Sequence, residues 1–70
     1  MAIFQEKTFF KAVEPIASAN SRVLVVAADL LNRAKETQDE VQKQKLLNAA
    51  QELIKASDTI SEALERAAKA

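Results

Sequence analysis

Carboxylates and lysines are the side chains of this chain that could do chemistry. The closest groups of carboxylates are Glu36 with Asp39 and Glu40, and Glu62 with Glu65. Such a pair can act as general acid and base when burial separates the pKa values of its members. All of these carboxylates stand in polar stretches, where nothing would remove water from them. A solvated charged face therefore explains them better than an acid–base site.

The composition excludes most other catalytic and cofactor chemistry. The chain has 70 residues and contains no His, no Cys and no Gly. Without His and Cys it lacks the usual nucleophile pairs and the common zinc ligands. Without Gly it cannot build a glycine-rich phosphate loop. We therefore predict that the chain is not an enzyme and that it has no catalytic residues, cofactor or metal site.

Charge, length and hydropathy narrow the classes of partner. Ten Lys and Arg balance ten Asp and Glu, and no basic stripe for nucleic acid results. The longest apolar run, residues 23–28, is far shorter than the roughly 20 residues of a membrane span. The amino terminus lacks a signal-peptide pattern, and the absence of Cys fits a reducing compartment. These features predict a cytoplasmic protein with a protein partner, no nucleic acid and no membrane span.

Two amphipathic helices must position whatever function the chain has. Apolar residues step by threes and fours from Phe9 to Ala34, and again from Leu46 to Ala68. Between them Thr37 and Glu40 have the spacing of a capping box. We predict one domain over residues 1–70, with a helix over about 4–35, a turn over about 36–39 and a helix over about 40–69. The alternative is one unbroken helix through the turn region.

Pro15 lies inside the first helical pattern. Proline within a helix removes a hydrogen bond and clashes with the preceding turn, at a cost of about 3 kcal/mol or more. Either one helix is kinked at Pro15, or a short helix over residues 8–13 ends and a second begins at Pro15. The apolar spacing continues through this site without a change of phase, which favours the kinked single helix.

Small side chains accompany the apolar stripe of the second helix. Ala49, Ala56, Ala63 and Ala70 recur every seven residues beside it, and small residues let helices approach closely. The residues that we predict to form the helix-partner interface are Val13, Ile16, Ala17, Asn20, Val23, Leu24, Ala27, Leu31, Leu46, Ala50, Leu53, Ile54, Ser57, Ile60 and Leu64.

Two features near the first stripe each allow two interpretations. Asn20 either fixes the register of helix pairing, as a single buried Asn does in coiled coils, or faces solvent at the kink. The aromatic residues Phe4, Phe9 and Phe10 either cap the end of the core or form a patch that binds a partner. For the aromatic residues we favour capping of the core. For Asn20 the sequence does not favour one interpretation over the other.

Three segments of the first helix follow one another in a recognisable order: Lys7-Thr8, then Val13-Glu14-Pro15-Ile16-Ala17, then the apolar run after Ser21-Arg22. This order resembles the amino-terminal first helix of vinculin and α-catenin. Residues 46–57 are similar, more loosely, to the Ala-rich helices of talin and vinculin bundles. The resemblance implies a scaffold of antiparallel helices that is linked to adhesion and actin and has no catalytic activity.

We predict an all-α helical hairpin that associates as a homodimer into an antiparallel four-helix bundle. Two matched arms carry apolar faces too broad to be covered within one hairpin. The expected function is a non-enzymatic interaction module, resembling vinculin and α-catenin, that binds a talin-type amphipathic helix among its own. The alternative is a self-associating structural bundle, natural or designed, with no cytoskeletal role.

Overall fold

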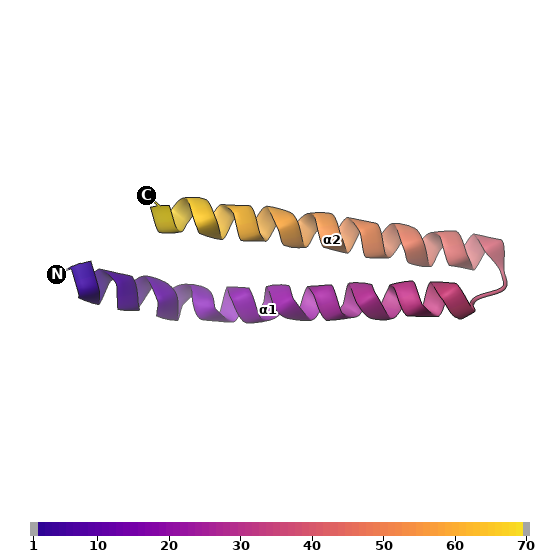
Figure 1. Cartoon of the computed structure of the whole chain (residues 1–70), viewed down its shortest axis with the longest axis horizontal. Coiled ribbons are helices and arrows are strands. Elements are labelled where there is room, and N and C mark those ends of the chain that lie inside the picture. The colour runs from indigo at the N-terminus through magenta and orange to yellow at the C-terminus, as the bar shows by residue number, and fades with distance from the viewer. Residues whose placement is uncertain (1, 70) are drawn as a thin grey trace.

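The computed structural model is a hairpin of two long antiparallel α-helices (Figure 1). Helix α1 spans Ala2–Glu36 and helix α2 spans Glu40–Lys69. The structure describes the backbone of residues 2–69 and the side chains of residues 8–69. The two helices pack against each other, and both ends of the chain lie at the end opposite the turn. The all-α hairpin predicted from the sequence is confirmed.

Helix α1 continues through Pro15 without interruption. The alternative of two separate helices is therefore wrong, and in Figure 1 the ribbon of α1 curves gently along its length. Proline has no N–H, so the carbonyl of Lys11 lacks its usual partner within the helix. Pro15 is exposed, and a freed carbonyl on the solvent side of a helix can bind water.

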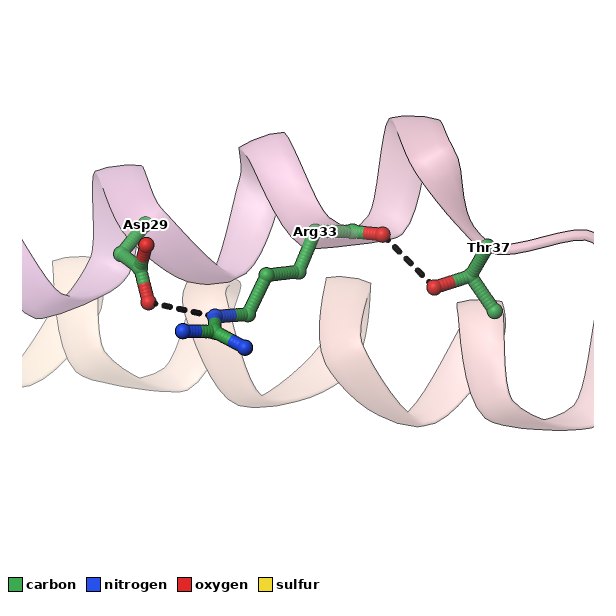
Figure 2. Close-up of polar contacts among 3 residues, drawn as sticks. All are labelled: Asp29, Arg33 and Thr37. Atoms are coloured by element: carbon green, nitrogen blue, oxygen red, sulfur yellow. Dashed lines mark hydrogen bonds and ion pairs between the residues drawn. The ribbon is translucent and has the colours of Figure 1, made fainter.

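Different residues end α1 and begin α2. The hydroxyl of Thr37 donates to the carbonyl oxygen of Arg33 at 2.6 Å (Figure 2), so it satisfies the end of α1. The Oδ1 atom of Asp39 accepts a hydrogen bond from the backbone N–H of Val41 at 2.9 Å, which makes Asp39 the N-cap of α2. The predicted capping box of Thr37 and Glu40 is therefore wrong. Both Thr and Asp can serve as an N-cap. In this turn Asp39 is the N-cap, and α2 begins at the next residue, Glu40.

Replacing Asp39 with alanine is expected to destabilise the hairpin by about 1 kcal/mol, because the N–H of Val41 loses its acceptor. The measurement is the urea midpoint followed by far-UV circular dichroism. Asp39→Asn is the control, since Asn caps as well as Asp. An Asp39→Ala midpoint equal to that of the native chain would contradict the cap.

A row of small side chains forms the centre of the contact between the helices. Ala27 and Ala50 are only 1% and 0% exposed. The buried residues recur every seven positions within each helix, and we call them the seam: Asn20, Ala27 and Ala34 in α1, with Ala50 and Ser57 in α2. Seven residues are nearly two helical turns, so each helix turns one narrow row toward the other. Small residues in that row allow a close approach of the two backbones.

Ion pairs join neighbouring turns on the outer surface. Among the described side chains, the ion pairs are Asp29–Arg33 at 2.7 Å, Glu62–Arg66 at 3.6 Å and Glu52–Lys55 at 3.7 Å. The first two have the i,i+4 spacing and the third has the i,i+3 spacing of neighbours on one face of a helix. The pKa of Arg33 is raised, mainly by its hydrogen bond to Asp29 (Figure 2) and to a smaller extent by the negative charge of Asp29. These side chains are exposed, so the pairs contribute little stability.

Candidate protein-binding surface

Large apolar side chains lie in rows on both sides of the seam. Successive residues of an α-helix are about 100° apart, so the residues three and four positions after a seam residue fall on opposite sides of it. Because the two helices are antiparallel, residues that stand the same number of positions after a seam residue lie on the same side of the hairpin in both helices. The hairpin therefore has two apolar sides that differ in their residues.

The first side carries the helical residues four positions after seam residues, together with those that continue the same rows in steps of seven residues. We call it the groove face, and it consists of Phe10, Ala17, Leu24 and Leu31 of α1 with Leu47, Ile54, Ser61 and Ala68 of α2. An open groove near the turn is lined by residues that include Leu31 and Leu47. A second groove, toward the open end, is lined by residues that include Leu24 and Ser61. Each groove is lined by residues of both helices, so these rows of α1 and α2 lie on the same side of the hairpin.

The two neighbouring aromatic residues mark the open end of the groove face. The rings of Phe9 and Phe10 meet edge to face, with centroids 5.9 Å apart and an angle of 69° between the planes. Phe9 is half-buried, but Phe10 is 63% exposed and lines the groove. The prediction that the aromatic residues cap the core is therefore wrong for Phe10, because most of its side chain is exposed. The side chain of Phe4 lies outside the described residues.

Asn20 is a buried polar residue in the seam. It is 9% exposed, and its Nδ2 group donates to the hydroxyl oxygen of Ser61 at 3.1 Å. The alternative in which Asn20 faces solvent is therefore wrong. Its Oδ1 atom is buried and has no hydrogen-bond partner. Asn20 also lines the groove at the open end.

The opposite side of the hairpin is broader and carries more alanine. It combines the residues three positions after the seam with those immediately before it. We call it the alanine face, and it consists of Ala12, Ile16, Ala19, Val23, Val26 and Leu30 of α1 with Leu46, Ala49, Leu53, Ala56, Ile60 and Ala63 of α2. None of the listed residues is charged, whereas Arg33, which stands immediately before the seam residue Ala34, carries a charge at the turn end of these rows. The listed residues place apolar side chains on this side of both helices.

The predicted interface residues are divided among these three surfaces. The seam contains Asn20, Ala27, Ala50 and Ser57, and its rows continue at the open end through Val13 and Leu64. The groove face contains Ala17, Leu24, Leu31 and Ile54, and the alanine face contains Ile16, Val23, Leu46, Leu53 and Ile60. Sequence reasoning missed Ala34 in the seam and Phe10 and Leu47 in the groove. Each stands seven residues from a predicted position, and this spacing could have identified them.

The hairpin exposes far more surface than a compact protein of its mass. Its accessible surface is 5757 Å², whereas a compact monomer of this size exposes about 4,300 Å². Its principal extents are 58 × 16 × 11 Å, because it is one layer of helices thick. The large apolar residues that are exposed include Leu24 and Ile54 on one side and Ile16 and Val26 on the other. Both faces are therefore open to a partner.

Two further findings concern the residues that the structure describes. Neither helix combines enough length and apolar character to cross a lipid bilayer. No group of carboxylates in the described part of the chain is arranged to hold a metal ion. Comparison with protein-family models, with curated proteins and with solved structures found no match for this chain.

Proposed function

We propose that this chain is a non-enzymatic helical interaction module that binds an amphipathic α-helix along its groove face. The observation that supports this function is the pair of open grooves on one side of the hairpin, one lined by Leu31 and Leu47 and the other lined by Leu24. An amphipathic helix laid along such a groove would bury its apolar stripe against both helices at once. Burial of apolar surface contributes about 25 cal/mol per Å², which supplies the driving force.

Polar groups along the groove define the helix that fits it. Lys35 and Lys43 line the groove near the turn, whereas Glu65 lines it near the open end. A matching helix carries acidic residues over the turn end and basic residues over the open end. Such rim charges set the orientation of a partner more than its affinity.

The class of partner that we propose is a talin-type amphipathic helix, within an adhesion-linked scaffold of the actin cytoskeleton. This part of the proposal is supported by the resemblance of Lys7-Thr8 and residues 13–17 to the first helix of vinculin and α-catenin. The apolar stripe of a talin-type helix has the i, i+3, i+4, i+7 spacing that a groove between two helices accepts.

A fluorescently labelled talin-type helical peptide tests this function by anisotropy. The native chain is expected to bind it, and Leu24→Glu is expected to weaken binding at least about tenfold, because it places an unpaired charge in the groove. Val25→Glu is the control, since Val25 is exposed and points away from both faces. No binding by the native chain, or equal binding by Leu24→Glu, would refute the proposal.

A second candidate function is a self-associating structural bundle in which copies of the chain cover both faces. It is favoured by the large accessible surface of 5757 Å². In that case the groove would be filled by another copy, and added peptide would leave the mass of the assembly unchanged. The interaction module predicts instead that the complex gains one peptide per chain in sedimentation experiments.

A further inference from the structure

We propose that the alanine face is the contact surface for a second copy of this chain, so that two hairpins form a four-helix bundle. This inference concerns the side opposite the groove and extends the proposed function, because it leaves the groove face free for an amphipathic helix. It is drawn from the order of small and large rows around each helix, from the charges at the edges of each face and from the exposed area.

The rows around each helix have the order that a square bundle of four helices requires. In such a bundle each helix touches two neighbours in directions about 90° apart, and larger side chains between these directions fill the centre. The seam of α1 is one small row, and the row immediately before it, about 100° away, contains Ala12, Ala19 and Val26. Ile16 and Val23 lie between the two rows. Each helix can therefore touch the other helix of its hairpin with one row and a second copy with the next.

Helix α2 repeats this order. The row before its seam contains Ala49, Ala56 and Ala63, and Leu53 and Ile60 lie between that row and the seam. Alanine rows on both helices let a second pair of helices approach as closely as the first pair does. The two central rows would together fill the middle of the bundle.

The edge of the groove face differs from this pattern. The residues immediately after the seam positions include Ser21 and Lys35 in α1, and Gln51 and Asp58 in α2. These polar and charged residues suit the rim of a groove that holds one narrow helix. They do not suit a broad contact between two hairpins. The second copy therefore belongs on the alanine face.

A contact between two identical faces is unfavourable when it brings like charges of the two copies together. In a twofold dimer every residue of the face meets residues of the same face. None of the positions that define the alanine face is charged from Ala12 to Leu30 of α1 or from Leu46 to Ala63 of α2. The charged residue of these rows is Arg33, before Ala34 at the turn end, and it is paired with Asp29 at 2.7 Å within its own helix. The uncharged middle of the face therefore brings no like charges together.

The exposed area is large enough for such a dimer. The 5757 Å² of accessible surface exceeds the value for a compact monomer of this mass by about 1,400 Å². A standard stable interface buries about 800 Å² on each partner. One face can therefore be covered by a second copy while enough exposed surface remains for a helix in the groove.

Sedimentation equilibrium of two matched variants tests this inference. Val26 of the alanine face and Leu24 of the groove face are 50% and 45% exposed, and they point about 200° apart because they are two residues apart. The native chain is expected to be a dimer at micromolar concentration. Val26→Glu should raise the dimer Kd at least about 100-fold, whereas Leu24→Glu should change it less than about threefold. A monomeric native chain, or the reverse order of the two variants, would overturn the inference.

A thiol-protection measurement gives a test that does not depend on a disruptive substitution. Ala56 of the alanine face and Ala28 at the edge of the groove are both exposed in the hairpin. The thiol of the Ala56→Cys variant should react with a maleimide at least about tenfold more slowly at dimeric than at monomeric concentrations. The thiol of Ala28→Cys should react at the same rate throughout. Equal rates of reaction for the two thiols would contradict the alanine-face contact. Peptide binding to the groove is tested independently by the anisotropy measurement on Leu24→Glu.

Discussion

Replacing Ala27 with leucine is expected to destabilise the hairpin by about 1–3 kcal/mol, because a larger side chain at this buried position would force the two helices apart. Ala27 is 1% exposed and lies in the middle of the seam. A hairpin with only small residues in its core has little stability to lose. The expected result is therefore a large fall in the urea midpoint measured by circular dichroism.

The neighbouring alanine provides a matched control for this substitution. Ala28 is exposed at the edge of the groove, so Ala28→Leu makes the same chemical change outside the seam. We expect it to alter stability by less than about 0.5 kcal/mol. If both variants lost equal stability, the small side chain of Ala27 would not be what sets the separation of the helices.

Replacing Asn20 with leucine is expected to raise the stability of the hairpin by about 1–3 kcal/mol. The reason is that the variant removes a buried carbonyl oxygen that has no hydrogen-bond partner. The hydrogen bond to Ser61 is lost as well, but both of its ends are neutral and its net contribution is smaller. The measurement is the urea midpoint at a fixed protein concentration.

The same Asn20→Leu variant should lose specificity as it gains stability. A single polar residue in a helix seam excludes pairings that leave it without a partner, and its removal admits other registers and assembly states. Sedimentation velocity should therefore show a broader distribution of species than for the native chain. Asn48→Leu, at an exposed position of α2, controls for the addition of a leucine. An unchanged or lower midpoint for Asn20→Leu would show that its amide is fully satisfied.

The helices and the seam could be predicted from the sequence because both follow from local spacing. The steps of three and four residues identify the two helices, and the polar stretch between them identifies the turn. Asn20, Ala27, Ala50 and Ser57 were all predicted as interface residues, and all are buried in the seam. A periodic stripe is sufficient to find which residues face a neighbouring helix.

The choice of helix cap and the division into two faces could not be predicted in the same way. Thr37 and Asp39 are both N-cap residues by type, and the geometry of the turn uses Thr37 at the end of α1 and Asp39 at the start of α2. The stripe of one helix also does not say on which side its neighbour lies. Leu24 and Val23 are adjacent in sequence, yet the direction of α2 places them on opposite faces. That direction is a property of the tertiary structure.

The connection of both helices through the one short turn after Glu36 also sets how fast the hairpin forms. Contacts near the turn close loops of a few residues, whereas the hydrogen bond between Asn20 and Ser61 joins residues 41 positions apart. The entropy lost on closing a loop grows with its length, so pairing should begin at the turn and spread toward the termini. Substitutions around Ala34 should therefore slow folding, and those around Asn20 should chiefly accelerate unfolding. A stopped-flow comparison of the two regions would reveal this polarity.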